Sequence, residues 1–305
     1  MPVCSVCRKL KNFRLHNVQN AFFNISKLFK RILFPSTPDK LRDKHLANNN
    51  LDYFNEYFEM VPAFSDELKN EVYKLRYQVY CIENEFLNSE HYPNDLEFDH
   101  FDQQSVHYLI RHRKSGDYAA TTRLILPDVT NPEKLFPLEQ HCEINNFAAM
   151  QPINRAHLAE VSRFCVSKEF NKRKDDRHAL AAIGSVRLDD FTLNERRSFP
   201  HLSLALIACF IKASYENDIH YLIATMEPSF FRFVSPLGIN LIKIGPLVDY
   251  HGERWPAMIK ITDLLDCVAK KNPNILNFLT NKGCFLQARP IIEIEPPPYG
   301  ARQKP

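Results

Sequence analysis

The amino-acid sequence predicts a mixed α/β fold in which helices cover both faces of a mostly antiparallel central sheet. Helical and strand-like segments alternate between residues 65 and 260, and two pairs of strands have the short spacing of hairpins. Hydrophobic residues make up 45% and charged residues 25% of the 305 residues, which is typical of a globular protein. The longest apolar run, residues 202–211, is too short to span a bilayer.

The sequence divides into three parts. Residues 1–56 read as a basic extension with a polar linker, residues 57–272 as the folded domain, and residues 273–305 as a Pro-rich tail. Ten Lys/Arg and two Asp give the first 50 residues a net charge of +8, which leaves −5 for the rest because the whole chain carries +3. A basic segment of this kind indicates an anionic partner, such as a membrane surface or an acidic protein.

Residues 20–34 have the period of an amphipathic helix. Its apolar residues share one sector and Lys27, Lys30 and Arg31 lie opposite. Such a helix can lie in a membrane interface, or its apolar face can dock on the protein's own body. The sequence leaves both interpretations open.

The first half of the domain contains one helix and three strands. Ser65 is the expected N-cap of a helix over residues 65–82, and Asp66 and Glu67 suit its first turn. The strands are predicted at residues 107–113, 118–127 and 157–167, with the turn KSGD joining the first two.

The second half alternates in the same way. A charged helix is predicted at 172–195, an apolar helix at 200–218, a strand at 219–226, and a short helix at 228–238 that Gly238 closes. A hairpin follows over residues 240–252 and 254–261.

Eight cysteines are scattered along the chain, several of them in apolar runs, which indicates reduced thiols of a cytoplasmic protein. Cys4 and Cys7 form a CxxC, but no second pair stands at a zinc-finger spacing. We therefore expect no metal site. An acidic body without a recognition motif also speaks against nucleic-acid binding.

Charged residues interrupt the apolar segments around the third predicted strand. A charge inside a buried strand is unfavourable unless it is paired, and breaking such a pair costs about 3–5 kcal/mol. The segments are neighbours in sequence and therefore expected neighbours in the sheet. One interpretation is a salt-bridge network that orders the loop 88–106. The other is a site in which carboxylates bind an amine and one acts as a base. The seven residues are Arg76, Glu97, Asp99, Asp102, Arg123, Glu160 and Arg163.

At these positions the sequence resembles the acyl-homoserine-lactone synthases, which belong to the GNAT acyltransferase superfamily. The resemblance covers residues 65–260. In its longer chain and basic extension, this sequence is more similar to the acyltransferases of PEP-CTERM/exosortase systems. N-acyl amino acid synthases are also similar. The shared motifs are R-x-x-x-Y (Arg76, Tyr80), an aromatic residue ten positions after the Arg (Phe86), ExDxxD (Glu97, Asp99, Asp102), TTRLILP (Arg123) and EVSRF (Glu160, Arg163).

The resemblance implies a GNAT fold, an acyl donor on acyl carrier protein or CoA, and a small amine acceptor, with no permanently bound cofactor. It makes Glu160 the candidate general base, whereas Asp102, Arg76 and Arg123 would organise the amine pocket. Arg163 and Glu97 would hold the loop. Tyr80, Phe86 and Asp99 would complete the substrate site.

Two departures from the family pattern concern the acceptor and one concerns the donor. Phe86 stands where the lactone synthases commonly have Trp, and the spacing from Arg76 to the acidic motif is slightly stretched. The glycine loop that binds CoA pyrophosphate in GNAT acetyltransferases is missing, because no Gly occurs between residue 167 and Gly184. A basic segment replaces it and would suit acidic acyl carrier protein, although a solvated loop is the alternative. Its residues are Lys168, Lys172, Arg173, Lys174 and Arg177.

Acyl transfer from a thioester to an amine requires deprotonation of the amine, donors for the carbonyl oxygen, and alignment. In a flat strand Glu160 and Arg163 would point to opposite faces, so they can cooperate only if a β-bulge intervenes. Cys165 is a rival nucleophile, but a Cys in a strand is usually a buried apolar residue. His107 is expected in the core or at the surface.

The leading hypothesis is a cytoplasmic N-acyltransferase, with peripheral membrane association through residues 20–34 as an option. A CoA-dependent N-acetyltransferase of a peptide or small amine is the second hypothesis, and the missing glycine loop speaks against it. A membrane-docked regulatory module that has lost turnover is the third. The retained acidic residues speak against that one.

Overall fold

The computed structural model describes residues 54–150, 153–170, 202–250 and 252–286. Several sequence predictions lie outside these residues. They are the helix at 20–34, the CxxC, the charged helix at 172–195, the part of the Pro-rich tail after residue 286, and the basic residues Lys172, Arg173, Lys174 and Arg177.

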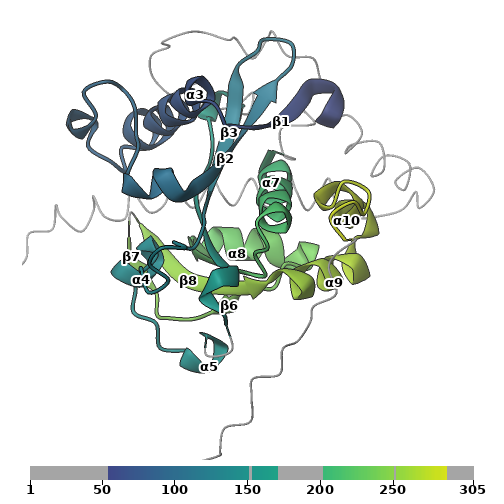
Figure 1. Cartoon of the computed structure of the whole chain (residues 1–305). Coiled ribbons are helices and arrows are strands. Elements are labelled where there is room, and N and C mark those ends of the chain that lie inside the picture. The colour runs from purple at the N-terminus through teal and green to yellow at the C-terminus, as the bar shows by residue number, and fades with distance from the viewer. Residues whose placement is uncertain (1–53, 151–152, 171–201, 251, 287–305) are drawn as a thin grey trace, which may run out of the picture.

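One mixed sheet forms the centre of the molecule, with the strand order β1-β2-β3-β4-β5-β8-β6, and β7 pairs with β8 (Figure 1). Only β4 and β5 run parallel, so the mostly antiparallel sheet expected from the sequence is confirmed. The strands are β1 (Phe58–Pro62), β2 (Ser105–His112), β3 (Tyr118–Ile125), β4 (Leu158–Val166), β5 (Tyr221–Met226), β6 (Ile242–Lys243), β7 (Val248–Asp249) and β8 (Glu253–Lys260).

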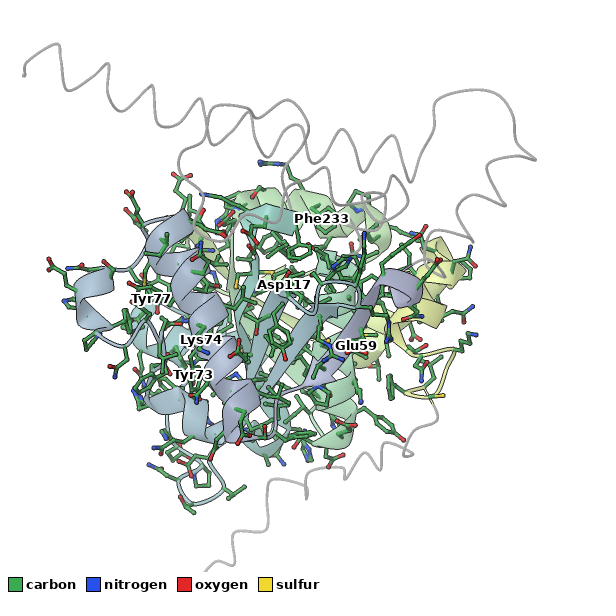
Figure 2. The ribbon with its side chains drawn as sticks, turned by 90° about the horizontal axis from the view of Figure 1, so that it is seen from above. Glu59, Tyr73, Lys74, Tyr77, Asp117 and Phe233 are labelled. Atoms are coloured by element: carbon green, nitrogen blue, oxygen red, sulfur yellow. The ribbon has the colours of Figure 1, made fainter. Side chains whose placement is uncertain are left out.

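Helix α3 (Asp66–Tyr77) covers one face of strands β2 and β3. Ser65 caps it by accepting a hydrogen bond from the backbone of Leu68, 3.3 Å away, as the sequence predicts. Figure 2 shows Tyr73, Lys74 and Tyr77 along this helix. The helix continues into a π-helical segment, η1 (Gln78–Glu83), and such segments are frequent at functional sites.

The next elements along the chain extend this face of the sheet. A 3-10 helix, η3 (His100–Gln104), leads into β2, and two short helices follow β3, α4 (Pro137–His141) and α5 (Phe147–Met150). Phe101, Phe136 and Leu138 pack there against Ile125 of β3 and Leu158 of β4. This apolar cluster places the loops beside the start of β4.

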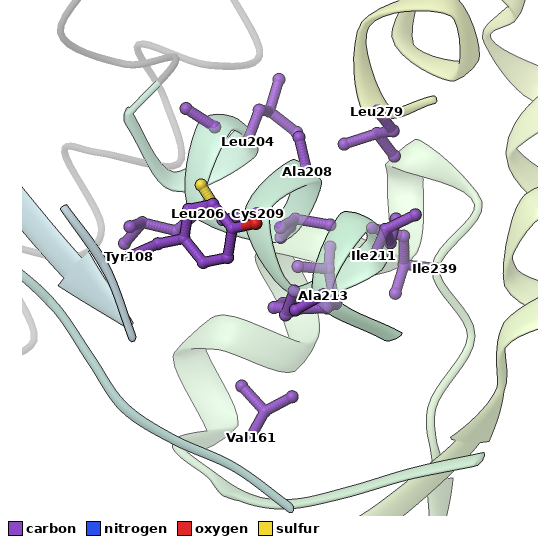
Figure 3. Packing of buried hydrophobic residues seen from close by; sticks show 14 of the residues in the cluster. Tyr108, Val161, Leu204, Leu206, Ala208, Cys209, Ile211, Ala213, Ile239 and Leu279 are labelled. Carbon is purple, nitrogen blue, oxygen red and sulfur yellow. The ribbon is translucent and has the colours of Figure 1, made fainter. Parts of the chain in front are cut away.

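Helix α7 (Leu202–Glu216) covers the opposite face. Eleven of its fifteen residues are buried, which explains its nearly continuous apolar sequence. Figure 3 shows its side chains packed towards Tyr108 of β2 and Val161 of β4. Helices α8 (Pro228–Val234), α9 (Ile261–Lys271) and α10 (Pro273–Leu279) lie on the same side of the sheet (Figure 1).

Gly238 ends the segment after α8 with a φ of 99°, and a Cβ there would lie 2.7 Å from the carbonyl oxygen of Cys267. The expected glycine closure therefore has two causes, the left-handed backbone and the close approach of α9. None of the described helices has both the length and the apolar character needed to cross a membrane.

Candidate active site

A buried network of ion pairs lies between α3, the loop before β2, and strands β3 and β4. Its centre is Arg76, whose side chain is completely buried and lies between two carboxylates. Arg76 Nε donates to Glu97 Oε2 over 2.5 Å, and Arg76 Nη1 donates to Asp102 Oδ1 over 2.7 Å. Helix α3 is thereby fixed to the loop that carries the ExDxxD motif.

Arg123 and Arg163 complete the network from the sheet. Arg123 Nη1 donates to Asp102 Oδ1 over 2.8 Å and to Asp99 Oδ1 over 2.7 Å. Arg163 Nη2 donates to Glu97 Oε1 over 2.9 Å and to Asp99 Oδ2 over 3.3 Å. The structure therefore brings six of the seven predicted charged residues into direct contact.

The carboxylates of this network are held ionised. Burial alone would raise the pKa of Glu97, but the guanidinium groups of Arg76 and Arg163 outweigh it and hold the pKa at about 2. In the same way, Arg76 and Arg123 outweigh the burial of Asp102 and hold its pKa well below its usual range. Asp102 Oδ2 also accepts the backbone N–H of Asp99 over 2.7 Å. These carboxylates are suited to fixing geometry and are poor proton acceptors.

A β-bulge in β4 turns Arg163 towards this network. The pairing with β3 shifts between Thr121, opposite Cys165, and Arg123, opposite Ser162, so β4 contains one extra residue. Arg163 has a φ of 49°, which is unusual for a residue with a side chain. Arg123 Nε donates to Ser162 Oγ over 2.9 Å, so Ser162 and Arg163 share one face of the sheet. The β-bulge that Glu160 and Arg163 need in order to face the same side of the sheet is therefore present.

Glu160 lies on the same face of β4 but outside the ion-pair network. It is 3% exposed, and its Oε2 accepts the backbone N–H of Leu138 over 2.8 Å. Within the described part of the chain, its other oxygen receives no hydrogen bond. Burial raises its pKa to about 8, although Leu138 and Arg123 oppose the shift. This carboxyl group is therefore mostly protonated at pH 7, unlike Glu97 and Asp102.

Strands β4 and β5 separate directly after Glu160. Their parallel pairing covers only Leu158–Glu160 opposite Tyr221–Ile223, while β5 continues against β8. An apolar cavity of about 20 Å³ lies in this region, and Val161, Ala224 and Phe230 are among its lining residues. Phe164, beyond the bulge, packs edge-on against Phe230 of α8 with 5.2 Å between ring centroids. Glu160 thus lies where the two strands diverge.

The aromatic residues of the predicted site lie on and after η1. Tyr80 is half-buried, and the guanidinium carbon of Arg163 lies 5.6 Å from the centre of its ring. Phe86 is 40% exposed and lines a surface cleft of about 490 Å³ with Ile82 and Leu87. Tyr80 therefore contacts the network directly, whereas Phe86 faces an open cleft beside it.

Three further residues singled out by sequence lie near β4. Cys165 is buried, and burial raises its pKa to about 12, so it is a protonated thiol near neutral pH and a poor nucleophile. His107 is a core residue whose pKa is lowered to about 4 by burial and by Arg76. Lys168 is exposed, and its backbone N–H donates to Glu83 Oε2 of η1 over 2.9 Å.

Sequence reasoning missed two partners of the predicted residues. Ser162 stands two positions after Glu160 in EVSRF, so the alternation of a strand could have placed it on the same face. The backbone N–H of Leu138 had no sequence signal, because it reaches Glu160 through a contact between segments 22 residues apart.

Among the described residues, one group of side chains could hold a metal ion, namely His157, Asp218 and His220. The two imidazole rings stack at 4.4 Å with 6° between their planes. A metal ion lies close to the plane of each imidazole that binds it, at about 2.0–2.1 Å from nitrogen, and these nearly parallel planes do not meet at such a point. His157 Nδ1 also lies 2.7 Å from the carbonyl oxygen of Asp218, a contact that places a proton on that nitrogen. The rings as arranged do not form a metal site.

One family model matches part of the chain. Residues 75–181 match the family described as acetyltransferase (GNAT) domain, in agreement with the GNAT superfamily expected from the motifs. No curated protein matches the chain.

Several solved structures are similar to part of this chain at low sequence identity. The acyl-homoserine-lactone synthase LasI is 19% identical, with 66% of this chain and 88% of that chain covered and a TM-score of 0.42. The CoA-dependent acyl-homoserine lactone synthase BjaI, solved with S-adenosylmethionine (SAM) and isopentyl-CoA, is 16% identical, with coverage of 74% and 88% and a TM-score of 0.44. FeeM, an N-acyl amino acid synthase from uncultured soil microbes, is 15% identical, with coverage of 69% and 93% and a TM-score of 0.40.

Proposed function

We propose that this GNAT-type acyltransferase joins a fatty acyl group to the amine of an amino acid or a related small acceptor. The acyl group comes from a phosphopantetheine thioester, on acyl carrier protein or on CoA. Glu160 accepts a proton from the ammonium form of the acceptor, and the resulting amine attacks the thioester carbonyl. The tetrahedral intermediate then expels the thiolate, and the former amine nitrogen loses its second proton. That proton balances the thiolate, which leaves as the thiol, and the amide is the product.

The state of Glu160 is the observation that carries this proposal. A general base works best when its pKa is close to the pH at which the enzyme operates, and the pKa of Glu160 is about 8. One carboxylate oxygen is fixed by Leu138, and the other accepts no hydrogen bond within the described residues. Glu160 is therefore oriented, and still able to take a proton directly or through a water molecule.

The neighbouring elements supply the remaining requirements. Beyond Glu160, β4 has no described partner strand on the side of β5, so backbone N–H groups there are available to polarise the thioester carbonyl. The apolar residues between α7, α8 and the sheet would receive the acyl chain. The ion-pair network, with fixed positive and negative groups, would orient the acceptor beside Glu160.

The proposal is tested with purified protein and mixed amino acids. One reaction receives long-chain acyl carrier protein, a second receives long-chain acyl-CoA and a third receives acetyl-CoA. We expect N-acyl amino acids by mass spectrometry in the first or second reaction. Products only with acetyl-CoA would replace the proposal with an acetyltransferase, and no product with any donor would favour a module without turnover.

Replacement of Glu160 by Gln tests the assignment of the base. Gln keeps an oxygen for the Leu138 N–H but cannot accept a proton, so we expect kcat to fall by about 10²–10⁴-fold with an unchanged circular dichroism spectrum. In the wild type, kcat/KM should rise with pH up to about 8 and then level off, because only the ionised carboxylate is active. An unchanged rate for E160Q would remove Glu160 as the base.

A further inference from the structure

The short helix α4 holds one half of the environment of Glu160. Leu138 at its second position donates its backbone N–H to Glu160 Oε2 over 2.8 Å. A helix of five residues has little stability of its own, because it contains hardly any complete intrahelical hydrogen bonds. The position of this donor must therefore be fixed by contacts outside the helix.

Arg155 makes those contacts. Its Nε donates to the carbonyl oxygen of Pro132 over 2.9 Å, and its Nη2 donates to that of Lys134 over 2.8 Å. Its Nη1 and Nη2 also donate to the two oxygens of Glu139 over 2.7 and 3.0 Å. The guanidinium carbon lies 5.4 Å from the centre of the Phe136 ring. One planar side chain thus joins the loop before α4 to the helix itself.

Glu139 transmits this constraint to the start of the helix. Its Oε2 accepts the backbone N–H of Phe136 over 2.9 Å, so the carboxylate fixes the residue before α4 as well as Arg155. Phe136 and Leu138 are both buried in the apolar cluster with Leu158 of β4. The donor to Glu160 is consequently held on one side by apolar packing and on the other by the Arg155–Glu139 pair.

We propose that Arg155 is a positioning residue for Glu160, which it serves through Glu139 and the backbone of α4. This inference rests on the proposed role of Glu160 as the base. Arg155 lies five positions before Glu160, in the turn η4 (Arg155–His157) that leads into β4. The same run of chain thus carries both the carboxylate and the side chain that fixes its hydrogen-bond donor.

Removal of Arg155 should raise the pKa of Glu160 for two reasons. The Leu138 hydrogen bond favours the ionised form of Glu160, and a looser α4 would weaken that bond. Glu139 would also lose its positive partner, and its negative charge disfavours a second charge at Glu160. The other ionisable groups that face Glu160 are Arg123, Arg163, Cys142 and Tyr250. The variant leaves them in place, so the pKa of Glu160 should rise.

The test compares R155M with R113M. Arg113 is a matched control at the β2–β3 turn, because it also donates to a backbone carbonyl, that of Asn55 at 3.0 Å, and to a carboxylate, that of Glu59 at 2.8 Å. The pKa of Glu160 is measured by NMR titration of ¹³C-labelled Glu, with E160Q identifying the resonance. This readout needs no substrate, so its failure is distinct from a failure of the proposed reaction.

We expect R155M to raise the pKa of Glu160 by about half a unit or more, and R113M to leave it unchanged. A rise of one unit from about 8 would lower the ionised fraction at pH 7, and with it kcat, by about ten-fold. A folded R155M with the wild-type pKa would overturn the inference. If R155M does not fold, R155K takes its place with the same two outcomes, because a single ammonium group cannot contact all of these acceptors at once.

Discussion

At the scale of single residues, the candidate site contains two kinds of buried carboxyl group. Glu97 and Asp102 each contact two Arg side chains and stay ionised. Among the described residues, Glu160 has a single backbone donor, and it keeps its proton until about pH 8. Burial is similar in all three, so the number of cationic partners decides the difference. The first pair can fix the site, and the third residue can exchange a proton within it.

Arg76 should be among the residues on which the stability of the fold depends most. In R76M, Glu97 and Asp102 each lose one of their guanidinium partners while they remain buried, so we expect the free energy of unfolding to fall by about 3–5 kcal/mol. K74M is the control two positions earlier on α3, where Lys74 is 58% exposed and pairs with Glu71. That variant should lose less than about 1 kcal/mol in urea unfolding. Equal losses would mean that burial of the network contributes little.

At the scale of elements, the bulge in β4 decides which side chains meet. Without the extra residue, Arg163 would point towards α7 and Glu97 would have one partner fewer. The backbone at Arg163 takes a φ of 49°, a conformation that is unfavourable for a residue with a Cβ. Strain of this kind persists where the surrounding contacts over-determine it, and here the ion pairs with Glu97 and Asp99 do so.

Two variants separate the backbone from the side chain at this position. R163G and R163A lose the same ion pairs, but only Gly adopts a φ of 49° without strain. We expect R163G to be more stable than R163A by about 1 kcal/mol in urea unfolding, and both to lose most of their turnover. If the two variants unfold at the same urea concentration, the bulge relaxes once the side chain is gone, and the strain account is wrong.

At the scale of the molecule, local patterns predicted helices α3, α7 and α8 and strands β2 to β5, but missed α4, α9 and α10. Helices α3 and α7 and strands β2 to β5 had clear periods or caps, whereas α4 and α10 are only five and seven residues long and too short to show a period. The ExDxxD and EVSRF motifs indicated the charged cluster. They could not show that Glu160 stands apart, because its donor on α4 comes from a tertiary contact.

The pKa shifts of Glu160 and Glu97 have opposite directions, and from them we predict how the stability of the whole domain depends on pH. The pKa of Glu160 is about 8 in the folded chain against an ordinary value of 4.5, so its protonated form stabilises the fold below pH 4.5, and this contribution is lost as the pH rises through 8. Glu97, with a pKa of about 2, acts in the opposite sense and loses its contribution as the pH falls from 4.5 through 2.

The difference in unfolding free energy between wild type and E160Q isolates the first effect, because Gln does not titrate and every other group is common to both proteins. We expect the wild type to lose stability relative to E160Q as the pH rises from 5 to 8, by at most about 1.4 kcal/mol per pH unit. Below pH 4 the two curves should fall together as Glu97 takes up its proton. Calorimetry measures the unfolding free energy of both proteins below pH 4 and between pH 5 and 8. Parallel stability curves of wild type and E160Q above pH 5 would show that Glu160 titrates alike in the folded and unfolded chain.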